Sequence, residues 1–221
     1  MRIAILIPTL GRANALAPLL ANLRETTPPI YRVCFVVDTA DTETRQAIEA
    51  MAPAEDFCNV YRDGTYPVKV GAGAAASAEP LIAPLADDVV FHAGWYEAAV
   101  ARFEDPAVQV VGTLDLTPAT ASGKNVTMPI VRRSYVDDPG AAYDEPGVLF
   151  HTGYHHNAVE RELWQLAKHR GVAVFEPNSI IEHRHHSFGT READDTDRKG
   201  NMANWDADLA LYHERERLWT S

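Results

Sequence analysis

Two adjacent carboxylates, Asp87 and Asp88, interrupt an apolar stretch of the chain. Residues 81–85 precede them, and three more apolar residues, 89–91, follow at once. Ionised side chains are costly to bury unless an opposite charge compensates them. A divalent cation is the simplest such partner, because Mg²⁺ and Mn²⁺ prefer hard oxygen ligands. A surface turn with two aspartates is the alternative, since short motifs often match by chance.

Histidines and glutamates form two further candidate groups. The run Glu182-His183-Arg184-His185-His186 follows an apolar stretch, and in a strand His183 and His185 would point to the same face. That spacing suits metal ligation or phosphate contact, although single histidines more often only pack or face solvent. Glu160 and Glu162 lie near the start of an expected helix, where the helix dipole favours carboxylates. They are candidates for acid–base chemistry or for stabilising the helix start.

Apolar runs and helical periodicities alternate along the first half of the chain. The pattern predicts strands at 2–8, 31–37, 57–61, 81–91 and 108–116, and helices at 14–24, 42–51, 70–77 and 94–104. Such alternation is typical of right-handed crossovers in a parallel sheet. Ligands of these sheets bind at the carboxyl ends of the strands. Pro8, Thr9, Asp38 and Asp41 fall at such ends, beside the place where the aspartate pair should emerge.

The second half of the chain changes character. Residues 117–150 are rich in Pro and Gly, with one short strand expected at 130–135, and so long an irregular stretch indicates a functional loop. Arg132 and Arg133 within it could hold an anion or be surface charges. Helices at 158–170 and 206–219 and short strands at 172–175 and 179–181 complete the prediction.

A glycine-rich stretch at 71–76 matches G-x-G-x-x-A. A nicotinamide site is disfavoured, because that fingerprint follows the first strand, whereas Pro67 and Lys69 precede this one. We instead expect a helix of small residues that packs closely against a ligand, with Lys69 able to reach a phosphate. An ordinary solvated lysine is the alternative.

Composition narrows the functional classes. The 221 residues are 46% hydrophobic and carry a formal charge of −11, which disfavours broad attraction to nucleic acid or to an anionic membrane. A phosphorylated substrate would then need local cations, which a metal could supply. The two cysteines are too few for a disulfide framework. No apolar run is long enough to span a bilayer, and the first residues lack the cleavage site of a signal peptide. We expect a soluble, cytoplasmic protein.

Four stretches, taken in order, resemble the GT-A glycosyltransferases of the family-2 type. They are IAILIPTLGRANALAPLLANL, FVVDTADTETRQAI, LADDVVFHAGW, and GYHHNAVERELWQLAKHRGVAVFEP followed by IIEHRHH. The last stretch especially resembles short glycosyltransferase-like proteins of phage and actinobacterial genomes. The resemblance implies an α/β fold of the GT-A (Rossmann-like) type, with a mixed, mostly parallel sheet flanked by helices. It implies a nucleotide-sugar-binding half at 1–116 and an acceptor-binding, catalytic half at 117–221.

The resemblance also implies roles for individual residues. Asp88, with His183 or His185, would bind Mn²⁺ or Mg²⁺. Ala86 stands where the family's D-x-D motif has an acidic residue, so Asp87 would contact ribose or a metal-bound water. The remaining donor-binding residues would be Pro8, Thr9, Arg12, Asp38 and Lys69. Glu160, or failing that Glu162, would be the general base of an inverting transfer from a nucleotide-diphosphate sugar. Residues 117–150 would close over both substrates and exclude water.

Three alternatives stay open at this point. One is a nucleotide- or glycan-binding protein of this fold without activity, which the alanine at position 86 favours. Another is a nucleotidyltransferase, although the turn IPTLGR has only one glycine. A metallohydrolase built on EHRHH is weaker, because the helical H-E-x-x-H spacing is missing. The sequence leaves open the sugar, the nucleotide, the oligomeric state and whether the acceptor is glycan, lipid or protein.

Overall fold

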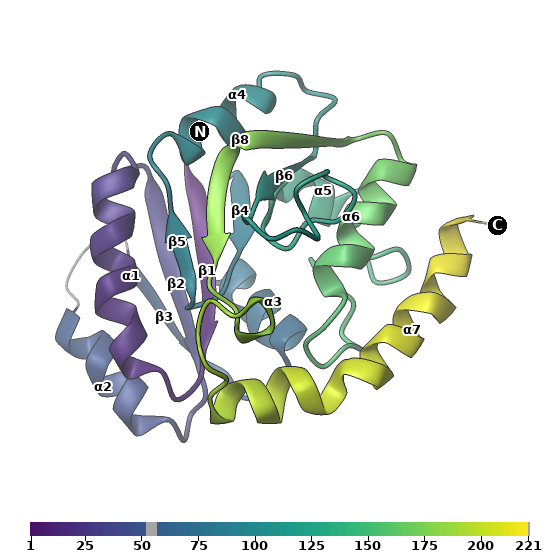
Figure 1. Ribbon diagram of the computed structural model, residues 1–221. Coiled ribbons are helices and arrows are strands. Elements are labelled where there is room, and N and C mark those ends of the chain that lie inside the picture. The colour runs from purple at the N-terminus through teal and green to yellow at the C-terminus, as the bar shows by residue number, and fades with distance from the viewer. Residues whose placement is uncertain (52–56, 221) are drawn as a thin grey trace.

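The computed structural model describes residues 1–51 and 57–220 (Figure 1). Its elements in chain order are β1 (Ile3–Thr9), α1 (Ala13–Thr26), β2 (Tyr31–Val37), α2 (Thr42–Met51), β3 (Phe57–Tyr61), α3 (Tyr66–Ala75), β4 (Leu81–Pro84), β5 (Val89–Phe91), α4 (Trp95–Arg102), β6 (Val110–Leu114), β7 (Pro129–Arg132), α5 (Arg133–Asp137), α6 (Val159–His169), β8 (Ala173–His183) and α7 (Ala203–Thr220). A 3₁₀ turn (His186–Phe188) and a π-helical turn (Asp197–Met202) connect β8 to α7.

The described strands form one mixed sheet in the order β3-β2-β1-β4-β7-β6-β8-β5. Strands β3, β2, β1 and β4 are parallel, β7 is antiparallel to both β4 and β6, and β8 is parallel to β6. The apolar strands are covered on both faces, as continuous hydrophobic runs predict. This architecture confirms the expected α/β, GT-A-like sheet flanked by helices.

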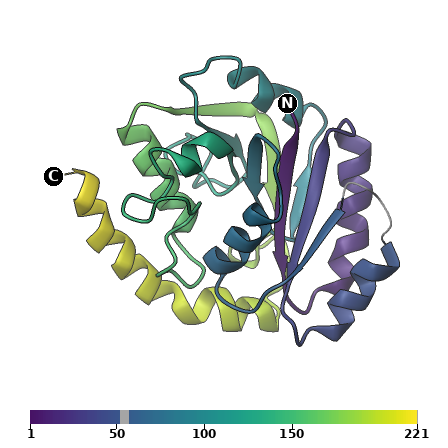
Figure 2. The ribbon, with the colours of Figure 1, turned by 180° about the vertical axis from the view of Figure 1, so that it is seen from behind.

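Alternate residues of the central strands enter two separate cores. Ile3, Ile5 and Ile7 of β1 face a core shared with α1, α2 and α4, whereas Ala4 and Leu6 face a core shared with α3, α5, α6 and α7. Figure 1 shows α1 and α2 on one side and α6 and α7 on the other, and Figure 2 shows the same layers from behind. No helix of the described residues combines the length and apolar character that crossing a bilayer requires.

The register of β5 on β8 brings distant residues together. These strands are antiparallel, with Val89 opposite His183, and the amide of Arg184 donates a hydrogen bond to the carbonyl of Asp88 at 2.8 Å. Parallel strands β1 and β2 end at the same edge of the sheet, with Thr9 opposite Val37. The sheet therefore gathers the predicted aspartates and histidines at one edge.

Several predicted elements differ from the structure. The strand expected at 81–91 is two strands, because the chain leaves the sheet at residues 85–88 and returns with the opposite direction. The strands expected at 172–175 and 179–181 are one strand, β8, whose pairing with β6 is irregular beyond Glu176. The segment 117–150 contains β7 and α5, and part of it is packed in the second core.

The small residues of α3 have a packing role. A Cβ atom on Gly73 would lie 3.1 Å from Val36 and 3.3 Å from Leu6, so this glycine allows α3 to lie close to β1 and β2. None of residues 70–77 lines the cavity described below, so the expectation that this stretch packs against a ligand is wrong for that cavity. Tyr66 and Lys69 of the same helix are the residues that reach the site described below.

Candidate functional site

One cavity of about 1250 Å³ opens at the carboxyl ends of the central strands. It collects most residues that the sequence singled out, namely Pro8, Thr9, Arg12, Lys69, Asp87, Asp88, Glu160, His183 and His185. Asp38 and Glu162 are not among its lining residues. A cavity of this size suits a nucleotide-sized ligand, and polar groups converge at one end of it.

Asp88 and His183 meet at the centre of the polar end. A carboxylate oxygen of Asp88 (Oδ1) lies 3.2 Å from Nε2 of His183, and its other oxygen (Oδ2) accepts a hydrogen bond from Arg191 at 2.8 Å. Burial opposes ionisation, but His183 and Arg191 hold the pKa of Asp88 well below its ordinary value. Asp88 is therefore an ionised carboxylate in a buried position, as a metal ligand must be.

Three neighbouring side chains extend this cluster. One ligand atom from each of His185, His186 and Asp197 lies within 4.8 Å of the others. Burial, with His183 and His186 nearby, lowers the pKa of His185 to about 4, which leaves its imidazole neutral at physiological pH.

The donor set fits a divalent cation. Nδ1 of His183 is buried and has no hydrogen-bond partner among the described residues, whereas Oδ1 of Asp88 and Nδ1 of His186 are buried atoms with one ion-pair neighbour each, His183 at 3.2 Å and Asp197 at 3.4 Å. Carboxylate oxygens suit Mg²⁺ and Mn²⁺, and neutral imidazole nitrogens are common ligands of divalent metal ions.

Arg12 joins the aspartate pair to the segment after β8. Its guanidinium lies 2.7 Å from Asp87, 2.8 Å from Asp194 and 2.7 Å from Asp197. The hydroxyl of Thr9 donates a second hydrogen bond to Asp87 at 2.6 Å. Asp87 is thus oriented by Thr9 and Arg12, while Asp88 faces the histidines. The two aspartates therefore have different partners, and the separate roles that the resemblance implies for them stay a prediction.

Glu160 enters the cavity from the first turn of α6. Ala158 precedes this helix with φ of 62°, a left-handed conformation that costs a non-glycine residue about 1 kcal/mol. Burial raises the pKa of Glu160 from 4.5 to about 7, although His183 and the hydroxyl of Tyr66 favour the charged form. A carboxylate with a pKa near 7 is suited to accept a proton at physiological pH.

Glu162 has a different environment from Glu160. Its carboxylate pairs with Arg215 of α7 at 2.8 Å and accepts a hydrogen bond from Tyr154 at 2.6 Å. Both Glu162 and Arg215 are buried, and the pair joins α6 to α7. This placement favours a structural role for Glu162 and leaves Glu160 as the proposed base.

The remaining donor-binding candidates are Lys69, Asp38 and Pro8. Lys69 is 2.8 Å from Asp38, and this pair connects α3 to the end of β2. Asp38 does not line the cavity itself, but it pairs with Lys69, which does. Pro8 is in the cavity wall at the end of β1. Arg132 and Arg133 donate hydrogen bonds to protein groups, chiefly backbone carbonyls.

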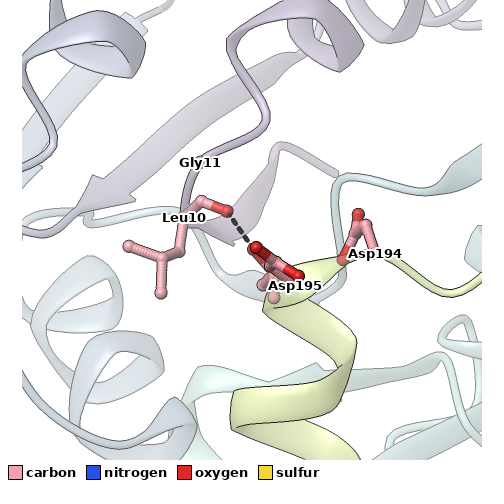
Figure 3. Close-up of a pocket in the computed structure, with 5 residues that line it drawn as sticks. Leu10, Gly11, Asp194 and Asp195 are labelled. Atoms are coloured by element: carbon pink, nitrogen blue, oxygen red, sulfur yellow. Dashed lines mark hydrogen bonds between the residues drawn. The ribbon is translucent and has the colours of Figure 1, made fainter.

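Sequence reasoning missed the contribution of the segment after β8. Arg191 pairs with Asp88 and Asp197, and Thr196 donates a hydrogen bond to the carbonyl of Leu10 at 2.8 Å. Figure 3 shows Leu10 and Gly11 facing Asp194 and Asp195 across a small pocket beside this contact. In the sequence, only the many charged residues at 191–198 indicate that this segment could contribute to the site, and their abundance does not show which residues they pair with.

Comparison with known proteins gives a consistent assignment. The model of the family "Glycosyl transferase family 2" matches residues 4–195. Among solved structures, the mannosyltransferase PcManGT from Pyrobaculum calidifontis, in complex with GDP-Man and Mn²⁺, is similar with a TM-score of 0.65 at 15% identity. The TarS 1–349 structure from S. aureus in complex with UDP is similar with a TM-score of 0.64 at 13% identity.

These likenesses to solved structures cover 82% of this chain, which spans 56% of the PcManGT chain and 59% of the TarS chain. At such identities they show a shared fold. No curated protein sequence matches the chain significantly. The match to the family model includes the cavity residues Asp87, Asp88, Glu160, His183, His185 and His186. The chain therefore belongs to glycosyl transferase family 2.

Proposed function

We propose that this protein transfers a sugar, with inversion, from a nucleotide-diphosphate sugar to a hydroxyl group of an acceptor. One observation carries the proposal. Glu160, whose pKa is about 7, shares a cavity with the Asp88–His183 cluster and is close enough for His183 to influence its ionisation. A base beside a cation-binding cluster is the arrangement that displacement of a nucleoside diphosphate requires.

The acceptor side of the reaction depends on Glu160. Its carboxylate would take the proton of the attacking hydroxyl, and the surrounding burial makes it basic enough to do so near pH 7. Inversion follows if the hydroxyl attacks the anomeric carbon opposite the departing diphosphate in one displacement.

The donor side depends on the residues of the polar end. Asp88, with His183 and His185, would hold a divalent cation, and Asp197 and His186 are near enough to complete its shell. That cation, when bound, supplies Lewis-acid stabilisation of the charge that develops on the leaving diphosphate. Lys69 and Arg12 would add positive charge, and Pro8, Thr9 and Asp38 would seat the nucleoside. The ligands of the two solved structures, GDP-Man with Mn²⁺ and UDP, support a donor of this class.

Residues 117–150 contribute to the cavity through Ala119 and 125–128. Closure of this segment over donor and acceptor, which would exclude water from the reaction, forms part of the proposal.

The test is a screen of GDP- and UDP-sugars for turnover in the presence of Mn²⁺, comparing wild type with Glu160→Gln and Asp88→Ala. Loss of turnover in both variants, with nucleotide binding kept in Glu160→Gln, supports the proposed roles. Turnover that neither substitution changes would overturn them. Nucleotide binding by wild type without any transfer or hydrolysis would favour the alternative of a binding protein.

A further inference from the structure

The wall of the cavity opposite the aspartates is built largely by the start of α7. Met202, Trp205 and Leu209 line it, and the first two are among the few large apolar side chains exposed in the described chain, at 56% and 53%. Exposed apolar side chains gathered in one cavity indicate a binding surface. These residues follow residue 195, where the match to the family model ends. This wall therefore lies outside the part of the chain that the family model describes.

Trp205 presents an aromatic face to the cavity. The other tryptophans of the chain, Trp95, Trp164 and Trp219, are at most 4% exposed. An aromatic ring has a negative face, which attracts the polarised C–H groups on the apolar face of a sugar ring. A π-helical turn, Asp197–Met202, leads into α7 just before Trp205, and such turns are frequent at functional sites. Trp205 is therefore suited to stack against a sugar.

Arg161 is the unusual cation of this cavity. Arg12 and Lys69 also line it, but both are paired with carboxylates. Among the described residues, no carboxylate lies within the 4.0 Å of an ion pair from Arg161, and its buried Nε has no hydrogen-bond partner. Its guanidinium lies 4.3 Å from the ring centre of Tyr212. A guanidinium held flat over an aromatic ring can offer its N–H groups to a carboxylate or phosphate.

The two side chains are placed to bind one extended ligand. Tyr212 is two turns after Trp205 on α7. Because the guanidinium of Arg161 lies over Tyr212, it is about 10 Å from Trp205 along the axis of α7. Leu209 lies between them in the cavity wall. Arg161 follows Glu160 in α6, and both side chains line the same cavity, so an anion bound at Arg161 would share that cavity with the proposed base.

We propose that the acceptor is an acidic saccharide, in which one sugar ring stacks on Trp205 and a carboxylate or phosphate group pairs with Arg161. This assignment of the acceptor class rests on the proposed function. The anion at Arg161 places a neighbouring hydroxyl at Glu160, and the apolar wall of Trp205 and Leu209 holds the rest of the saccharide.

Binding can be tested without donor or metal. The ligand panel consists of glucose, galactose and mannose, each as the neutral methyl glycoside, the uronic acid and the 6-phosphate, in EDTA at constant ionic strength. Because Trp205 is the exposed tryptophan, its fluorescence should change as a sugar stacks on it, and Trp205→Phe should remove that signal. We expect at least one acidic ligand to bind roughly ten-fold more tightly than its neutral counterpart.

Variants isolate the two contacts. Arg161→Gln should remove the preference for the acidic ligand, whereas Arg217→Gln, the same change at an exposed position of α7 outside the cavity, should keep it. Trp205→Ala should weaken acidic and neutral ligands alike, measured by thermal shift, and Trp205→Phe should restore most of the shift. A preference for uronic acids or for 6-phosphates would identify which anion the site takes.

Equal binding of acidic and neutral ligands, equal effects of the two arginine variants, or binding of no panel member would overturn the proposal. Thermal stabilisation by GDP or UDP with Mn²⁺ reports on the donor half separately. Acidic ligands that bind Arg161 and Trp205 in a protein that binds neither nucleotide would refute the proposed function and leave this subsite standing. Binding of GDP or UDP by a protein that shows no preference for acidic ligands would refute this acceptor subsite and leave the proposed function standing.

Discussion

Replacing Glu160 by glutamine should remove the proposed chemistry and also stabilise the fold at alkaline pH. The pKa of Glu160 is about 7 in the folded protein because the side chain is buried, against an ordinary value of 4.5. Each unit of difference between the folded and the ordinary pKa corresponds to about 1.4 kcal/mol in the free energy of unfolding. The ionised carboxylate therefore costs the folded state on the order of 3 kcal/mol above pH 7.

The direction follows from the order of the two pKa values. Because the folded value is the higher one, the stability associated with protonated Glu160 is fully present below about pH 4.5 and is lost as pH rises through about 7. Urea unfolding followed by circular dichroism, between pH 4 and 8.5 with EDTA, measures this loss. The free energy of unfolding of wild type minus that of Glu160→Gln should fall by about 3 kcal/mol across the range. Turnover, where it occurs, should rise through the same pH range.

Glu162→Gln is a matched control, for which the expected change in the free energy of unfolding at pH 8 has the opposite sign. It makes the same chemical change two residues along the same helix, but it leaves Arg215 buried without its 2.8 Å partner. Breaking a buried pair costs roughly 3–5 kcal/mol, so this variant should be less stable than wild type at pH 8, where Glu160→Gln is more stable. A difference between wild type and Glu160→Gln that does not vary with pH, or a Glu160→Gln variant less stable than wild type at pH 8, would refute the reasoning.

Three further substitutions test other parts of the site and fold. Asp88→Asn should abolish thermal stabilisation by Mn²⁺ with a nucleoside diphosphate and lower turnover roughly 10²-fold or more, while circular dichroism stays native. Asp208→Asn should lower the free energy of unfolding by about 1–3 kcal/mol, as measured in urea, because this buried carboxylate accepts hydrogen bonds from three successive amides, 155–157. Gly112→Ala should lower the melting temperature in calorimetry, since a Cβ atom there would lie 2.8 Å from Trp164 and 2.5 Å from Val126.

Much of the fold follows from local patterns. Strands β1 and β2 are continuous apolar runs, and the crossover helices between them show one apolar stripe each, so their order and parallel direction were predictable. The meeting of Asp88 with His183 or His185 was expected only from the resemblance to GT-A glycosyltransferases, and the antiparallel pairing of β5 with β8 brings Asp88 to His183. The order and direction of the first strands depend on periodicity, which the residues carry locally.

Other features depend on tertiary contacts that no local pattern encodes. The break between β4 and β5 reverses the chain within an apolar stretch that looks continuous in sequence. Arg12 pairs with Asp194 and Asp197, which are more than 180 residues away. Glu160 and Glu162 look equivalent in sequence, and only the position of Arg215 separates their environments. In each case the partner, and not the residue itself, decides the role.

The charge balance at the polar end connects these observations. Four carboxylates, Asp87, Asp88, Asp194 and Asp197, meet two guanidiniums, those of Arg12 and Arg191. The formal charges of these six groups, four negative and two positive, leave an excess of two negative charges, which is the charge that one divalent cation would cancel. Since the segment after β8 supplies half of these carboxylates, binding of the proposed cation would depend on the position of that segment. The same segment continues into α7, so ordering of the proposed donor site would also position the proposed acceptor wall around Trp205.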